Sequence, residues 1–206
     1  MKVLILGAGR VGGSLARALV SNNYDVAIVD QDKNALNSLE EKLDIMTIEG
    51  HASHPISIKK SGADENTTVI AVTSKDEVNI IACQVAKKLF NVKKTICRIT
   101  DESYGKDLDM FGEKIIDILI SPEDEVKNHL KDLIIHPGTD QIEKFADGKV
   151  NLVSVKAKKK GKLVGRELKG IKDDMPDTDA FVASIYRKGK PFIPSGETII
   201  LSLIHI

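Results

Sequence analysis

The stretch that decides the fold reads KVLILGAGRVG and occupies residues 2–12. Its first half, Lys2–Leu6, is a mostly apolar run that ends at a glycine, the pattern of a strand buried on both faces of a sheet. Its second half matches G-x-G-x-x-G, and a helical apolar pattern through Leu15 and Leu19 follows it. A strand, a glycine turn and a helix in this order predict the first unit of a Rossmann-type dinucleotide-binding fold.

The rest of the first 122 residues extends this unit into an alternation of strands and helices. Further strands are expected at 25–30, 45–48, 68–73, 95–99 and 117–120, with helices between them. The clearest helix covers 77–89, where apolar residues recur with helical period, namely Val78, Ile81, Ala82, Val85, Ala86 and Leu89. Strict alternation with short polar connections implies βαβ units, and hence an α/β fold with a doubly wound parallel sheet.

Each glycine of the loop has a separate physical task. Gly7 allows a tight turn, Gly9 lets the backbone approach a pyrophosphate, and Gly12 lets the helix pack close to the strand. The N-terminus of that helix offers unpaired N–H groups and a positive dipole end to phosphate. Asp30 closes the second strand 18 positions after Gly12, where its carboxylate can accept hydrogen bonds from both ribose hydroxyls. It would repel a 2′-phosphate, so NAD is favoured over NADP.

Three further groups are expected at the carboxyl edge of the sheet, where open α/β folds bind ligands. The segment Gly50-His51-Ala52-Ser53 follows the third strand. Thr73 and Ser74 follow the fourth strand, and their hydroxyls fit either a ligand contact or a helix cap, or one of each. Arg98 lies near the end of the fifth strand and can meet the charge of a pyrophosphate. The predicted cofactor-binding residues are Gly7, Ala8, Gly9, Arg10, Val11, Gly12, Asp30, Thr73, Ser74 and Arg98.

Composition and residue pattern exclude several other classes of protein. Of the 206 residues 42% are hydrophobic, and 30 Lys+Arg residues balance 30 Asp+Glu residues, so no nucleic-acid partner is predicted. The five histidines lack carboxylate partners and metal-ligand spacing, so neither catalytic residues nor a metal site are predicted. Cys83 and Cys97 are expected to be buried and reduced. No apolar stretch approaches the roughly 18 residues of a transmembrane helix, so a soluble chain is expected.

Several segments together resemble a known family. Beside the glycine loop and Val29-Asp30, they are Gly50-His51-Ala52-Ser53-His54-Pro55, Ala71–Asn79, Ala82–Ala86, Ile120–Glu123, His136–Gly138 and Phe145–Val150. Over nearly the whole chain they are similar to the RCK (KTN) regulators of K⁺ transport, and in particular to the first half of NAD-binding Trk subunits. The resemblance implies NAD contacts at Gly7–Val11, Asp30, Thr73-Ser74 and Arg98. Many members have an aspartate where His51 stands, so the adenine contacts are expected to differ here.

The resemblance also divides the chain into parts. Residues 1–122 correspond to the N-terminal RCK domain, 123–142 to a linking or crossover helix with its loop, and 143–206 to a small, truncated α+β C-terminal domain. The helix carries Val126, Leu130, Leu133 and Ile134 on one face, which fits either an ordinary core helix or a crossover that embraces a second subunit. Strands are expected at 152–155 and 181–186, with a solvated turn at 158–162. No function is assigned to residues 201–206.

The function that the resemblance implies is regulatory rather than enzymatic. A cytosolic subunit would bind NAD⁺ or NADH, with ATP or ADP as competing ligands of the same site, and so gate a membrane potassium uptake transporter. The implied partners are a membrane-embedded K⁺ transporter subunit of the TrkH/TrkG type and further copies of the chain in a dimer or ring. The implied location is the inner face of the bacterial plasma membrane, reached through that partner. Two alternatives stay open: an NAD-dependent oxidoreductase, and a regulatory subunit of another K⁺ channel or transporter that responds to ATP or ADP.

Overall fold

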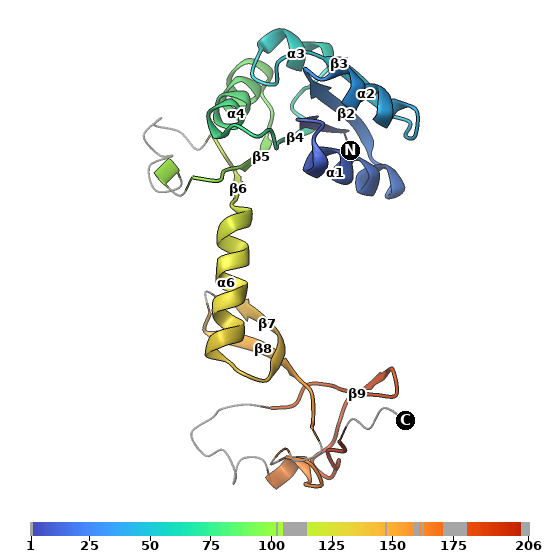
Figure 1. The fold of residues 1–206 in the computed structure, drawn as a ribbon, viewed down its shortest axis with the longest axis vertical. Coiled ribbons are helices and arrows are strands. Elements are labelled where there is room, and N and C mark those ends of the chain that lie inside the picture. Colours follow the sequence, from blue (N-terminus) through green and yellow to red (C-terminus); the bar gives the residue numbers. More distant parts are fainter. Residues whose placement is uncertain are drawn as a thin grey trace. The chain divides into compact units, whose positions relative to one another are not determined.

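The chain forms two compact units, Met1–Lys127 and Asn128–Ile206 (Figure 1). The structure is a computed structural model, and it describes residues 2–101, 103–104, 115–146, 148–158, 161, 163–170 and 181–202. Within these ranges no helix combines the length and the apolar character that crossing a membrane requires.

A six-stranded sheet forms the centre of the first unit. Its strands are β1 (Lys2–Leu6), β2 (Asp25–Asp30), β3 (Met46–Glu49), β4 (Thr67–Ala71), β5 (Lys94–Arg98) and β6 (Ile118–Ile120). They lie in the order β3-β2-β1-β4-β5-β6, and every neighbouring pair is parallel. This is the strand order of a Rossmann sheet, so the predicted doubly wound α/β fold is confirmed.

Helices cover both faces of this sheet (Figure 1). They are α1 (Arg10–Ser21), α2 (Lys33–Glu40), α3 (Pro55–Lys60) and α4 (Asp76–Phe90). Along β1, Val3 and Ile5 pack into the core formed with α1 and α2, whereas Leu4 and Leu6 pack into the core formed with α3 and α4. Because both faces are covered, the central strands are apolar at nearly every position rather than at alternate ones. Cys83 and Cys97 lie in the second core as buried free thiols, as predicted.

The buried face of α4 differs from the predicted one. Its buried residues are Asn79, Ile80, Ala82, Cys83 and Ala86. In contrast, two residues of the predicted stripe are largely exposed, Ile81 at 43% and Leu89 at 59%. The helix turns Ile80, one asparagine and several small side chains toward the sheet, so its most buried face is rotated from the predicted stripe.

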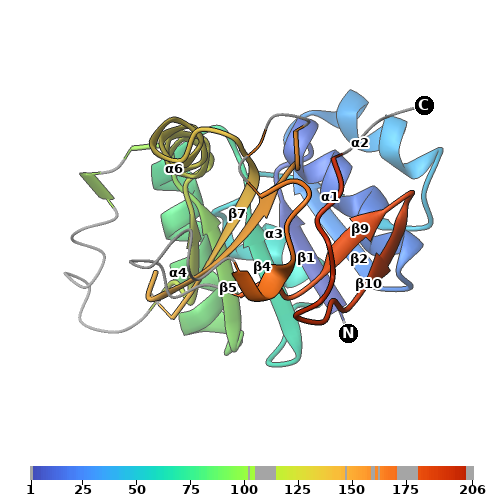
Figure 2. The same ribbon diagram turned by 90° about the horizontal axis from the view of Figure 1, so that it is seen from below.

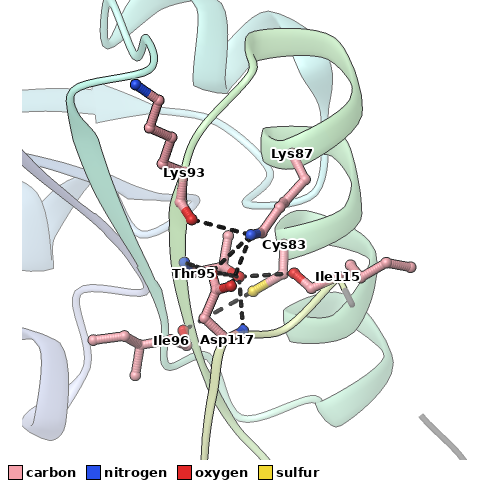
Figure 3. Close-up of polar contacts among 7 residues, drawn as sticks. All are labelled: Cys83, Lys87, Lys93, Thr95, Ile96, Ile115 and Asp117. Carbon is pink, nitrogen blue, oxygen red and sulfur yellow. Dashed lines mark hydrogen bonds and ion pairs between the residues drawn. The ribbon is translucent and has the colours of Figure 1, made fainter. Parts of the chain in front are cut away.

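A polar cluster fastens the last strand to the rest of the sheet (Figure 3). Asp117, just before β6, accepts hydrogen bonds from Lys87 Nζ of α4 at 2.9 Å and from the Thr95 amide of β5 at 2.7 Å. Partial burial alone would raise the pKa of Asp117, but the hydrogen bonds from Lys87 and Thr95 outweigh it and hold the pKa below its usual value. The charged carboxylate therefore ties α4, β5 and β6 together.

The second unit contains two small antiparallel sheets. One pairs β7 (Thr139–Phe145) with β8 (Val150–Val155), and the other pairs β9 (Ile185–Arg187) with β10 (Lys190–Phe192), which Figure 2 shows side by side. A short 3₁₀ helix, η2, covers Leu168–Gly170. The sequence missed β7, because TDQIEKF does not alternate apolar and polar residues.

Several other predicted bounds need correction. Two strands were predicted too long: β4 ends at Ala71 rather than at residue 73, and the strand expected at 181–186 begins only at Ile185. In addition, β8 begins at Val150 rather than at residue 152, and β5 ends at Arg98 rather than at residue 99. The predicted turn at 158–162 lies largely outside the described residues, as do four of the last six residues.

Helix α6 (Pro122–Ile135) follows β6 and carries an exposed apolar face. Within the described chain none of its residues is buried, and the side chains of Val126, Leu130 and Ile134 are 60%, 54% and 78% exposed. Both predicted roles of α6, an ordinary core helix and a crossover that embraces a second subunit, stay predictions.

Candidate functional site

The glycine loop lies where the strand order reverses, between β1 and β4. Gly7 has a φ of +113°, a conformation that side chains rarely allow, and a Cβ there would lie 3.0 Å from the Thr73 amide nitrogen. The loops that follow β1 and β4 therefore contact each other at Gly7. The crevice beside such a switch point is where open α/β sheets bind ligands.

The other two motif glycines differ in their surroundings. At Gly12 an added Cβ would lie 1.8 Å from the Gly7 carbonyl oxygen, so the packing of α1 against the turn requires glycine. At Gly9 an added Cβ would meet no described atom within 4 Å. The fold therefore has no need of glycine at position 9, where the first turn of α1 begins. Gly9, Arg10 and Val11 are exposed, and this open cradle of backbone N–H groups fits a pyrophosphate.

Asp30 ends β2 and reaches back to the glycine loop. Its carboxylate accepts hydrogen bonds from the Ala8 amide and, at 2.9 Å, from the Asp32 amide. Ala8 is buried, and its amide already donates a hydrogen bond to Asp30. The Ala8 amide therefore holds the Asp30 carboxylate in place. A carboxylate has about four lone-pair sites, so the half-buried Asp30 can still accept hydrogen bonds from ribose hydroxyls.

Asn79 of α4 joins the loops that follow β4 and β5, although the sequence did not single it out as a site residue. Its Oδ1 accepts hydrogen bonds from the Thr73 amide at 2.9 Å and from the Thr73 hydroxyl at 2.7 Å. Its Nδ2 donates to the carbonyl oxygens of Thr73 at 3.2 Å and Arg98 at 2.9 Å. The Thr73 hydroxyl is therefore turned into the protein and positions the loop, whereas Ser74 beside it is exposed.

A sequence signal for Asn79 existed. The residue lies three, four and seven positions before Ala82, Cys83 and Ala86, and so belongs to the same buried stripe of α4. A polar side chain within a buried stripe requires hydrogen-bond partners, and loops at the nearby strand ends supply them here.

Arg98 ends β5 with 24% of its side chain exposed. Its Nε is buried and has no hydrogen-bond partner among the described residues. Its Nη2 lies 3.7 Å from Glu123 Oε1 of α6, which is an ion-pair distance but too long for a hydrogen bond. A buried donor without a partner is costly, and a phosphate or hydroxyl of a ligand would satisfy it.

A recess of about 530 Å³ lies at the carboxyl ends of β2 and β3. Its lining residues are Gln31, Glu49, Gly50, His51, His54 and Lys60. The His51 ring packs on the His54 ring with centroids 4.5 Å apart, and the Ser53 hydroxyl lies 3.0 Å from His51 Nδ1. The sequence singled out only the histidine loop here, because Gln31 and Lys60 join the recess through the fold. Flat rings and polar edges of this kind suit a heteroaromatic base.

Residues 3–122 match the model of the TrkA-N domain family. The chain belongs to this family. The resemblance to the RCK (KTN) regulators is thereby confirmed. The assignment of the ten residues to a cofactor stays a prediction.

Known relatives of this TrkA-N chain carry the Trk name. The chain is 45% identical over 97% of its length to the Trk system potassium uptake protein TrkA of Halomonas elongata. It spans 44% of that protein, and is therefore less than half as long. It is 30% identical to a TrkA homolog of Pyrococcus abyssi, and covers 88% of that protein with 97% of its own length.

A solved structure shares the fold. The GsuK channel bound to NAD aligns with a TM-score of 0.65 and 17% identity, over 97% of this chain and 35% of that one. At this level of identity the likeness extends to the fold alone.

Proposed function

We propose that this TrkA-N chain is the nucleotide-binding part of a regulatory subunit that gates a membrane potassium uptake transporter, and that its ligand is NAD⁺ or NADH. The open space over Gly9 carries this proposal. The fold demands glycine at positions 7 and 12. At position 9, the N-cap of α1, the space is open and other cap residues would fit as well, and a ligand that approaches the backbone gives a further reason for glycine.

The proposed binding mode follows the surroundings of each group. The pyrophosphate lies over the exposed N–H groups of residues 9–11 at the N-terminus of α1. Asp30 accepts hydrogen bonds from the adenosine ribose, and the base enters the recess that His51 and His54 line. Arg98, whose Nε lacks a partner among the described residues, binds the phosphate charge from the side of β5. The ligand serves as a signal, bound and released unchanged.

The regulatory role is supported by the relatives and by α6. The relatives are named as parts of Trk potassium uptake, and the GsuK channel structure holds NAD. A ligand can gate a transporter only if it binds two conformations with different affinity. Two such conformations require another part that moves relative to the nucleotide-binding unit. The exposed apolar face of α6, with Val126, Leu130 and Ile134, is suited to contact another copy of the chain in a dimer or ring. The membrane partner is a K⁺ transporter subunit of the TrkH/TrkG type, which brings the chain to the cytoplasmic face of the membrane.

Calorimetric titration of the chain with NADH, NAD⁺, NADPH and ATP tests the ligand. We expect saturable binding of NADH or NAD⁺ and much weaker binding of NADPH, because Asp30 repels a 2′-phosphate. ATP is the main competitor, since Asp30 can serve the ribose of a mononucleotide as well. Absence of binding by all four ligands would refute the proposal.

A matched pair of variants tests where the pyrophosphate lies. Gly9→Ala adds a methyl group into open space, so we expect at least tenfold weaker NADH binding, roughly 1.4 kcal/mol, with only the small loss of stability that alanine causes at a helix N-cap. Gly12→Ala adds the same methyl group 1.8 Å from the Gly7 carbonyl oxygen, so it should lower stability itself. If Gly9→Ala binds NADH like the unaltered chain, the loop does not hold the pyrophosphate.

A further inference from the structure

Arg98 stands between the nucleotide site and the first turn of α6. Its carbonyl oxygen is held by Asn79, which also holds Thr73 beside the glycine loop. Its guanidinium faces Glu123, the second residue of α6. The side chain proposed to bind ligand phosphate is therefore already paired with a carboxylate of the same chain.

The ion pair between Arg98 and Glu123 is loose. Its separation of 3.7 Å exceeds the 2.7–2.9 Å typical of charge-assisted hydrogen bonds, and the Glu123 side chain is 53% exposed. Pairs of this kind add little to stability, so the fold has little need of this one. The main effect of Glu123 is electrostatic, because its carboxylate reduces the positive potential that Arg98 offers to a ligand.

The loose pair has a consequence for ligand choice. Resting on the nucleotide site proposed above, we propose that Glu123 determines specificity by competing with ligand phosphate for Arg98, and so disfavours ligands in proportion to their phosphate charge. NADH brings about two negative charges and ATP about four at neutral pH. Glu123 therefore selects the dinucleotide against the triphosphate.

The size of the effect follows from Coulomb's law. Two like charges about 7 Å apart in a water-like dielectric change affinity roughly threefold, and the change multiplies with each additional ligand charge near the carboxylate. The outer phosphates of ATP feel Glu123 less than the one at Arg98. We therefore expect the ratio of the ATP and NADH dissociation constants to depend on Glu123 by about threefold to tenfold. Salt should weaken this dependence, because Glu123 is exposed.

Glu123→Gln tests the proposal in the chain as it stands. NADH and ATP are titrated calorimetrically at low ionic strength, with a chelator present to exclude divalent cations. We expect both nucleotides to bind more tightly and ATP to gain more than NADH, so that the ratio of their dissociation constants shifts by about threefold to tenfold, with the shift shrinking at high salt. The matched control is Glu125→Gln, which removes the same charge from the same helical turn but not from the Arg98 ion pair. Its effect on the ratio should stay below about twofold.

The same substitution in an Arg98→Gln background completes a double-mutant cycle. If Glu123 acts in part by competing for Arg98, Glu123→Gln changes the ratio less in that background than in the unaltered chain, where direct repulsion and competition both operate. An unchanged ratio in Glu123→Gln, an equal change in Glu125→Gln, or a change that is equally large without Arg98 would each overturn the inference. Failure of the unaltered chain to bind either nucleotide overturns the proposed function and this inference with it. Binding by the unaltered chain with no effect of Glu123→Gln overturns this inference alone.

Discussion

Replacing Asn79 with alanine should both destabilise the first unit and loosen the nucleotide site. The Asn79 side chain is fully buried and makes hydrogen bonds to the amide, hydroxyl and carbonyl of Thr73 and to the carbonyl of Arg98. Truncation leaves at least the Thr73 amide and the Arg98 carbonyl without this partner. Each buried group left unsatisfied costs about 1–3 kcal/mol, so we expect a loss of about 3–5 kcal/mol in the free energy of unfolding.

The control variant is Thr73→Val, which keeps the size of the side chain and removes one hydroxyl. It breaks the 2.7 Å hydrogen bond to Asn79 Oδ1 and the longer hydrogen bonds of the same hydroxyl with the Lys75 carbonyl and amide, but it leaves the Thr73 amide bonded to Asn79 Oδ1. The expected loss is about 1 kcal/mol. The comparison of the two variants therefore separates the hydrogen bonds of the Thr73 hydroxyl from the whole connection between the loops after β4 and β5.

The assay is amide hydrogen exchange of β1 and β4, whose central residues are buried and should exchange through unfolding of the whole first unit. A single melting curve is unsuitable, because the chain has two compact units. In the same samples NADH affinity should fall by about tenfold, since Thr73 and Arg98 lose their common anchor. If Asn79→Ala costs no more than Thr73→Val, Asn79 does not connect the two loops energetically.

Two further predictions concern carboxylates. Asp30→Ala should weaken NADH and ATP binding by about tenfold to a hundredfold, because charge-assisted hydrogen bonds to ribose are lost. The same variant should improve the relative affinity for NADPH. Undiminished NADH affinity in calorimetry would rule out the ribose contact. Asp117→Asn should lower stability at neutral pH, because Asp117 has a pKa below its ordinary value of 3.8 when folded and stabilises the fold only while charged. The difference from the unaltered chain, measured at each pH by amide exchange of β1 and β4, should be constant from about pH 8 to 5 and shrink below about pH 4 as the folded carboxyl is protonated. A difference independent of pH would show that the charge of Asp117 contributes nothing.

The sequence alone determined the fold class and the centre of the site. Continuous apolar runs at Lys2–Leu6 and Asp25–Asp30 predict strands covered on both faces, and these are β1 and β2. The spacing of Gly7, Gly9, Gly12 and Asp30 predicts a turn next to a carboxylate, and the Ala8 amide does bond to Asp30. Such features follow from local backbone geometry and short-range periodicity, which neighbouring residues in the chain encode.

Only the tertiary structure decided which side chains meet across the strand ends. Thr73 and Arg98 are 25 positions apart and share Asn79, and Arg98 faces Glu123 after another 25 positions. The direction of the Thr73 hydroxyl, the rotated face of α4 and the exposure of α6 likewise depend on contacts between distant segments. Periodicity indicates that a face is apolar, but whether it is buried depends on what packs against it. Hydrogen-bond partners depend on strand order, and strand order exists only once the chain has folded.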